Sequence, residues 1–227
     1  VASFHDALAS AHELALTGNL VTLGVKPSFA CTGYGYIRYG TSVVTSSDVV
    51  GFEVDKFVEK PDEITAKVYL SQSNYLWNSG MFVVQPSVLI EEAELYCSQL
   101  LYHCKLTVQS ITKDLDFIRL PEQKFSQCED TSLDYAIMEH TLKAVVVPVD
   151  CGWSDVGDFQ ALWKANTLDD AGNSLHGDAV VLNSHNCLVK AKNRLVAVIG
   201  IDGLAVIETK DAVLVTPLDQ AQQVKEL

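Results

Sequence analysis

The clearest pattern along the chain is an alternation of apolar and polar residues that stops at a charged pair. Residues 50–55 alternate in this way, which is typical of a strand with one buried face. The pattern ends at Glu59, Lys60 and Pro61, because proline removes a backbone donor from the ladder. Open α/β sheets bind ligands beyond the carboxyl ends of their strands. A carboxylate beside an ammonium there suits a phosphorylated, hydroxyl-rich ligand, and a solvated ion pair is the alternative.

Other apolar segments predict helices that alternate with strands. Ser3 is placed to cap a helix whose apolar stripe ends at Gly18, and a buried strand follows over residues 20–25. Residues 144–149 form a continuous apolar run, as expected for a strand buried on both faces. A helix followed by a buried strand is the second half of a βαβ unit, so we predict an α/β fold and a chain that is a piece of a longer protein.

Further segments have helical patterns. Asp62 is expected to cap a helix that runs to about Leu70, and an apolar stripe indicates one long helix from Pro86 to about Thr107. That helix would place Cys97 and Cys104 on one face, as core residues. Residues 108–128 predict an irregular or partly helical segment, and a helix with a hydroxyl cap is expected over 131–139.

From Gly172 onward the pattern changes to short strands separated by turns, with a short helix from Leu218. No crossover helix fits between these strands, so we expect an all-β domain. The predicted domains are therefore residues 1–171 and 172–227. The five strands are expected over 178–182, 186–191, 194–199, 204–208 and 212–215.

Composition narrows the class of protein. The 227 residues include 29 acidic and 16 basic side chains, a formal net charge of −13, and no basic patch. This argues against binding to nucleic acid or to an anionic membrane, and an anionic substrate would need local lysines or a metal ion. The six cysteines form no CxxC pair and have no metal-ligand spacing, so we expect reduced, buried thiols in a cytoplasmic protein. The longest nearly apolar run, 195–207, is too short and too interrupted to span a bilayer.

Three other places could carry chemistry. Gly33 and Gly35 flank Tyr34 before a strand and would let the backbone approach a ligand, and on these residues alone a plain loop-to-strand turn is the favoured alternative. Asn78 stands at the start of an apolar strand, where its amide could donate to and accept from a sugar hydroxyl, or cap its own backbone. Asp155 follows the strand of residues 144–149 and could bind Mg²⁺ against phosphate oxygens, or cap the next helix.

Five motifs in this order carry a resemblance: TGYGYI, FVEKP, WNSGMF, SLDYAIME and GWSDVGD. Together they resemble the bacterial mannose-1-phosphate guanylyltransferases, most closely the type often fused to a mannose-6-phosphate isomerase. The similarity continues through residues 193–215 and 221–225, so it covers nearly the whole chain.

The resemblance implies a Rossmann-like nucleotidyltransferase domain followed by a small all-β domain. It implies that GTP and mannose 1-phosphate give GDP-mannose and pyrophosphate with Mg²⁺. Glu59 and Asn78 would contact the sugar and Lys60 its phosphate. Asp155 would bind the metal, and Gly33, Tyr34 and Gly35 would line the sugar pocket. A homodimer through the β-rich tail is a further expectation.

The chain also departs from the family pattern. The glycine-rich loop that holds the nucleotide triphosphate has no match here, and a second metal-binding aspartate belongs before Val1. Cys31 stands where glutamate is usual, and Asp158 where serine is common. We therefore expect the sugar half of a site, and no turnover by this chain alone. The alternatives are a non-catalytic sugar-phosphate-binding subunit and a pyrophosphorylase for another sugar 1-phosphate.

Overall fold

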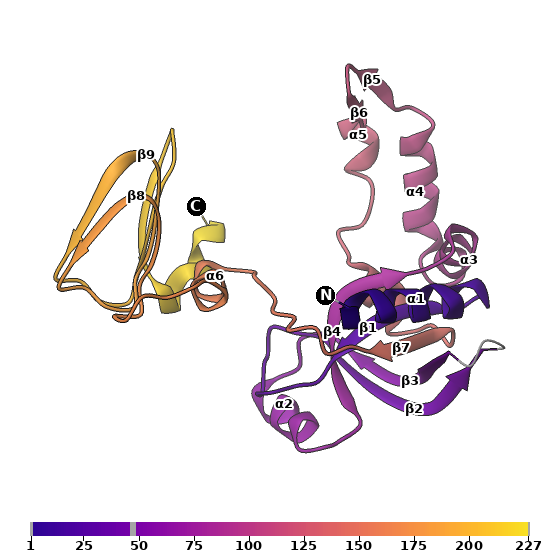
Figure 1. The fold of residues 1–227 in the computed structure, drawn as a ribbon. Helices are drawn as coiled ribbons and strands as arrows, with labels where there is room; N and C mark the ends of the chain where they lie inside the picture. The colour runs from indigo at the N-terminus through magenta and orange to yellow at the C-terminus, as the bar shows by residue number, and fades with distance from the viewer. Residues whose placement is uncertain (1, 46–48, 227) are drawn as a thin grey trace. The chain divides into compact units, whose positions relative to one another are not determined.

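The computed structural model describes residues 2–45 and 49–226, which form two compact units, 1–153 and 154–227 (Figure 1). The first unit mixes helices and strands, and the second is rich in strands, as predicted. None of the helices in the described part of the chain is long and apolar enough to cross a membrane.

The core of the first unit is a sheet of five strands. They lie in the order β1-β4-β2-β3-β7, and β1 and β7 are parallel, as expected for the apolar run near residue 146. The sheet closes into a barrel, because β3 and β7 pair at Phe52–Val146 and Glu53–Val145. The strands are β1 (Leu20–Val25), β2 (Tyr36–Val44), β3 (Val50–Val58), β4 (Tyr75–Val83) and β7 (Ala144–Pro148).

Helix α1 (Ala2–Leu16) covers β1 and β7 with an apolar face that includes Ala11 and Leu14. The predicted cap was wrong, since the helix begins at Ala2 and the Ser3 hydroxyl donates to the Asp150 carbonyl oxygen over 2.8 Å. Helix α2 (Glu63–Leu70) begins as predicted, with the Asp62 carboxylate accepting from the Thr65 amide over 2.7 Å.

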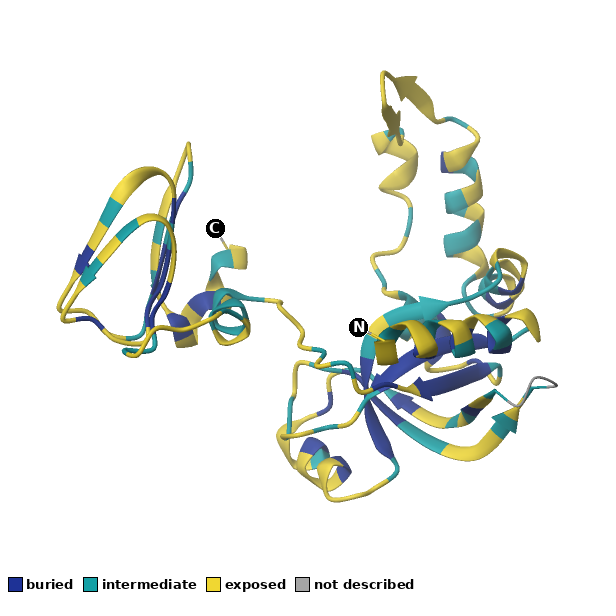
Figure 2. Cartoon of the chain, viewed as in Figure 1, coloured by how far each residue is buried: buried dark blue, intermediate teal, exposed yellow. Residues whose placement is uncertain are grey.

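The predicted long helix is two helices, α3 (Pro86–Tyr96) and α4 (Ser98–Val108), because the backbone turns at Cys97 with φ −144° and ψ 50°. The chain continues through the short strands β5 (Thr112–Asp114) and β6 (Phe117–Arg119) and the helix α5 (Glu122–Phe125). We call residues 98–128 the arm. It projects from the sheet, and most of it is exposed (Figures 1 and 2).

The helix predicted over 131–139 is instead a short π-helix, η1 (Asp134–Met138). The amide of Glu139 reaches back five residues to the Asp134 carbonyl oxygen over 3.0 Å. Single π turns inside helical segments are frequent at functional sites.

In the second unit, β8, β9 and β10 run parallel and β11 pairs antiparallel with β10. Two of the five predicted strands are one strand, β9, because the Glu208 carboxylate accepts from the backbone amides of Lys192 and Asn193 over 2.8 and 2.7 Å. These bonds satisfy the backbone where a turn was expected. The elements are α6 (Phe159–Ala165), β8 (Ser174–Leu182), β9 (Leu188–Ile199), β10 (Leu204–Glu208), β11 (Val213–Pro217) and the 3₁₀ helix η2 (Leu218–Glu226).

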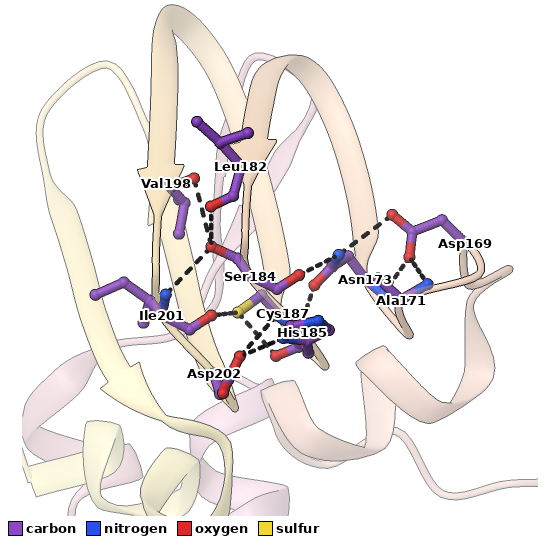
Figure 3. Close-up of polar contacts among 10 residues, drawn as sticks. All are labelled: Asp169, Ala171, Asn173, Leu182, Ser184, His185, Cys187, Val198, Ile201 and Asp202. Atoms are coloured by element: carbon purple, nitrogen blue, oxygen red, sulfur yellow. Dashed lines mark hydrogen bonds and ion pairs between the residues drawn. The ribbon is translucent and has the colours of Figure 1, made fainter.

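Polar contacts, buried at Asn173, fix the turn between β8 and β9 (Figure 3). The Asn173 side chain donates to the Ser184 carbonyl oxygen and accepts from the Cys187 amide, each over 3.0 Å. His185 contacts Asp202 over 2.9 Å, and this hydrogen bond is the main reason that the pKa of Asp202 lies below its ordinary value.

Helix α6 precedes the expected domain boundary at residue 172 but packs on strands that follow it. Phe159, Leu162 and Trp163 contact a cluster that contains Leu188 and Leu218. The boundary at 172 stays a prediction, and α6 belongs by its packing to the second unit.

The packing of α1 makes a prediction about stability. Leu14 is fully buried, so Leu14→Ala should destabilise the first unit by about 2–5 kcal/mol. Leu16 on the same helix is 56% exposed, and Leu16→Ala should change stability by less than about 0.5 kcal/mol. Urea unfolding followed by tryptophan fluorescence measures both, because Trp77 and Trp153 report on this unit. Equal effects of the two substitutions would contradict the packing of α1.

Candidate functional site

Four of the residues singled out in the sequence lie together in the first unit: Gly35, Glu59, Lys60 and Asn78. Strand β4 lies between β1 and β2, and its Trp77 pairs with Tyr36 of β2 and with Val25 of β1. The next residue, Asn78, donates its backbone amide to the Gly35 carbonyl oxygen over 2.8 Å. These contacts place the start of β2 beside β4 at Trp77 and Asn78.

Glu59 and Lys60 extend from the end of β3 toward the same place. The Lys60 ammonium is 3.0 Å from Glu59 Oε1, and this hydrogen bond is the main reason that the pKa of Lys60 lies above its ordinary value. The Glu59 side chain is only 12% exposed, whereas that of Lys60 is 58% exposed. Lys60 has φ +48°, a strained conformation for a side chain of this size. The carboxylate is thus held in place, and the ammonium stays open to solvent.

Gly35 packs closely against Glu59 and Asn78. A Cβ atom there would lie 2.5 Å from Glu59 Oε2 and 3.2 Å from Asn78 Cβ. Gly33 has no such constraint, because it is exposed and the closest neighbour of a Cβ would be Cys31 Sγ at 3.8 Å. The structure therefore brings Gly35, Glu59 and Asn78 together and leaves Gly33 in the loop before them.

The side chain of Asn78 is largely committed to the protein. Its Oδ1 accepts from the Thr22 hydroxyl over 3.0 Å and from the Gly80 amide over 3.1 Å, so both lone pairs are used. Its Nδ2 donates one hydrogen to Asp134 Oδ1 over 2.9 Å. Backbone capping, one of the two expected roles, is therefore present. The other expectation is corrected in part, since this amide can donate one further hydrogen to a ligand but cannot accept.

Sequence reasoning missed two acidic residues that position this cluster. Asp134 in η1 accepts from Asn78, and Glu139 Oε1 accepts from the Glu59 backbone amide over 3.1 Å. Both lie in the motif SLDYAIME, within the segment predicted as a helix over 131–139. The separation of 56 residues between Asn78 and Asp134 gives no local signal.

Aromatic rings line the neighbouring part of the unit. The ring of Tyr34 packs edge-on against Trp77 at 5.1 Å and against Trp153 at 5.5 Å between centroids. Phe29 packs on Trp77 at 4.9 Å. These contacts fix the loop that carries Tyr34 and Gly35 beside β4.

Asp155 belongs to the second unit and is exposed. Its alternative role as a helix cap is wrong, because Asp158 caps α6 by accepting from the Ala161 amide over 2.7 Å. In the described residues, no group of three or more His, Cys, Asp or Glu side chains is arranged to hold a metal ion. A single free carboxylate still fits Mg²⁺, which is often bound by one or two carboxylates together with phosphates and water.

Comparison with known proteins finds two family matches along the chain. Residues 2–172 match the family model described as Nucleotidyl transferase, and residues 177–227 match the MannoseP isomerase/GMP-like beta-helix domain. A solved structure from Thermus thermophilus, named mannose-1-phosphate geranyltransferase, has a TM-score of 0.79 and 30% identity. The match covers 99% of this chain and 63% of the Thermus thermophilus chain.

Curated relatives give the same assignment. The chain is 44% identical to a mannose-1-phosphate guanylyltransferase of Klebsiella pneumoniae over 98% of its own length and 47% of that protein. It is 42% identical to a protein of the same name in Escherichia coli strain K12, over 99% of the chain and 47% of that protein. The chain thus spans about half the length of the curated relatives it matches. The family resemblance found in the five motifs is confirmed, and the chain belongs to the nucleotidyl transferase family.

Proposed function

We propose that this chain supplies the sugar-phosphate half of an enzyme that makes GDP-mannose and pyrophosphate from GTP and mannose 1-phosphate. The observation that carries the proposal is the cluster of Gly35, Glu59, Lys60 and Asn78, which places a held carboxylate, an open ammonium and one free amide hydrogen together. The names of the relatives point to the same reaction.

The cluster suits mannose 1-phosphate by its donors and acceptors. Glu59 Oε2 accepts from a sugar hydroxyl, while the second amide hydrogen of Asn78 donates to a hydroxyl oxygen. Lys60 keeps two ammonium hydrogens beyond its bond to Glu59, and these meet the phosphate. Gly33 and Tyr34 complete the rim of the sugar pocket in this proposal.

The reaction is an in-line displacement. A phosphate oxygen of mannose 1-phosphate attacks the α-phosphorus of GTP, the new P–O bond forms, and pyrophosphate leaves. The chain's own residues aim the attacking oxygen, and no covalent bond to the protein is needed. Mg²⁺, when bound through Asp155, would supply charge neutralisation on the phosphates.

The remaining assignments follow from this function. Residues 1–171 form the sugar-phosphate-binding part and residues 172–227 the β-rich domain. We also infer a cytoplasmic homodimer. The exposed apolar side chains of Val180, Leu182 and Ile199 on β8 and β9 support a pairing surface in the tail. An isomerase activity, as in the name of a Helicobacter pylori structure with TM-score 0.61 and 30% identity, stays a prediction for a longer protein.

Titration calorimetry with mannose 1-phosphate tests the proposal on this chain. Lys60→Ala should weaken binding about 10- to 100-fold, as expected for the loss of a charge-assisted hydrogen bond worth about 1.5–3 kcal/mol. Lys67→Ala removes the same charge from α2, where the ammonium pairs with Glu63, and should bind like the unchanged chain. No binding by the unchanged chain, or equal binding of mannose 6-phosphate, would refute the proposed ligand.

The hydrogen bond from Asn78 to Asp134 makes a second prediction. Asp134→Ala should weaken mannose 1-phosphate binding about fivefold, because a lost hydrogen bond costs about 1 kcal/mol and the amide is then free to turn. Asp134→Asn keeps an acceptor oxygen and should restore binding. Asp130→Ala, an exposed acid outside this cluster, is the matched control. If Asp134→Asn binds as weakly as Asp134→Ala, charge rather than orientation is the important property.

The metal assignment is tested in the full-length protein. Asp155→Asn should lower kcat about 10²–10³-fold and raise the Mg²⁺ concentration needed for half activity, because charge on the transferred phosphate is then less well neutralised. Asp158→Asn changes only the α6 cap and should leave the Mg²⁺ dependence unchanged. An unchanged Mg²⁺ dependence in Asp155→Asn would remove Asp155 from the metal site.

A further inference from the structure

The arm carries a close pair of thiols outside the candidate site. The Sγ atoms of Cys104 on α4 and Cys128 after α5 are 3.9 Å apart. A disulfide bond is about 2.05 Å long, so the sulfurs need only a small approach. The two residues are 24 positions apart in sequence, and the expectation that Cys104 is a core residue alongside Cys97 did not anticipate this contact.

The two thiols connect the two legs of the arm. Cys104 lies on the outgoing leg, and Cys128 follows α5 on the returning leg (Figure 1). The tip between them is exposed, with Leu115 at 94% and Ile118 at 63%. Lys124 donates to the Ser110 hydroxyl, a further polar contact between the legs. A covalent bond at the thiols would therefore tie together a segment with little buried surface of its own.

We propose that Cys104 and Cys128 are a modification site, at which a peroxide converts the two thiols into an intramolecular disulfide. First, one thiolate attacks an oxygen of hydrogen peroxide, the O–O bond breaks, and the hydroxide that leaves takes up a proton to give water. The resulting sulfenic acid is attacked by the second thiolate, the new S–S bond forms, and a second water leaves. Two electrons from the two sulfurs reduce one peroxide to two waters.

A third cysteine, Cys97, lies near this pair, so the proposal also states which two thiols react with each other. Cys97 and Cys104 both line an apolar cavity of about 300 Å³ between α3, α4 and residues 131–137. Burial raises the pKa of both thiols, and the hydrogen bond with Cys128 raises that of Cys104 further. Because the thiolate is the reactive form, the raised pKa values slow the reaction of Cys97 and Cys104 with mild oxidants. Which of the two forms a disulfide then depends on whether a second thiol lies close to it. The structure gives that partner to Cys104.

The test is peroxide treatment of the chain at low protein concentration, followed by alkylation with N-ethylmaleimide and mass spectrometry. Free thiols should fall from six to four, with a cross-link between Cys104 and Cys128. No lysine or arginine lies between Cys97 and Cys104, so trypsin leaves both on one peptide. Chymotrypsin is needed, because it can cut after Leu101 and Tyr102.

Serine variants decide which sulfurs react. Cys104→Ser and Cys128→Ser should each abolish the cross-link, whereas Cys97→Ser, the matched control on the same cavity, should keep it. A cross-link that contains Cys97, or a loss of thiols without the 104–128 bond, would overturn the proposal. So would six thiols that survive prolonged treatment with a large excess of peroxide.

Limited trypsin treatment gives an independent readout. Lys113 and Arg119 lie in the exposed tip, so a cut there separates the two legs. After oxidation, the two pieces should run as one band on a non-reducing gel and separate with reductant. Separation without reductant, in oxidised protein, would show that no bond joins the legs.

Discussion

The hydrogen bonds of the Asn78 side chain connect parts of the chain that are distant in sequence. Thr22 from β1 and Asp134 from η1 each lie 56 residues away from it. Since the Asn78 backbone also bonds to Gly35, one residue fixes β1, the loop before β2, and the π-helix around a single point. Buried polar networks of this kind are costly when incomplete, so the position of each partner depends on the others.

These bonds also restrict the chemistry that the cluster can perform. An asparagine amide ordinarily offers two donors and two acceptor sites, and here only one donor remains. The acceptor for a hydrogen bond from a ligand must therefore be Glu59. Its Oε2 lies against Gly35, and its Oε1 pairs with Lys60. Donor and acceptor roles are divided between two residues, as suits a hydroxyl group that does both. This division could not be read from residue types, because it depends on contacts far apart in sequence.

The sequence was informative where the signal is local. The alternation that ends at Glu59, the Asp62 cap and the apolar strand near residue 146 all follow from short-range rules, and each lies where it was expected. The errors have tertiary causes. Glu208 keeps β9 extended through an expected turn, and Cys97 breaks an amphipathic helix that has no proline or glycine at that point.

The Asp at position 158, a departure from the family's serine, is neutral in structural terms, because both residues cap helices well.

Charge decides how an anionic substrate could lie in this cluster. Glu59, Asp134 and Glu139 gather there, and Lys60 is paired with one of them. A phosphate near the carboxylates would meet repulsion in addition to a protein net charge of −13. The uncharged hydroxyls of a sugar meet no such repulsion, and the carboxylates can accept hydrogen bonds from them. In the proposed complex the exposed end of Lys60 would face the phosphate from the solvent side, and its hydrogen bond to Glu59 raises its pKa further above neutrality. The arrangement of charges thus favours one direction of binding, with the sugar toward the carboxylates and the phosphate toward solvent, where its oxygens remain free to react.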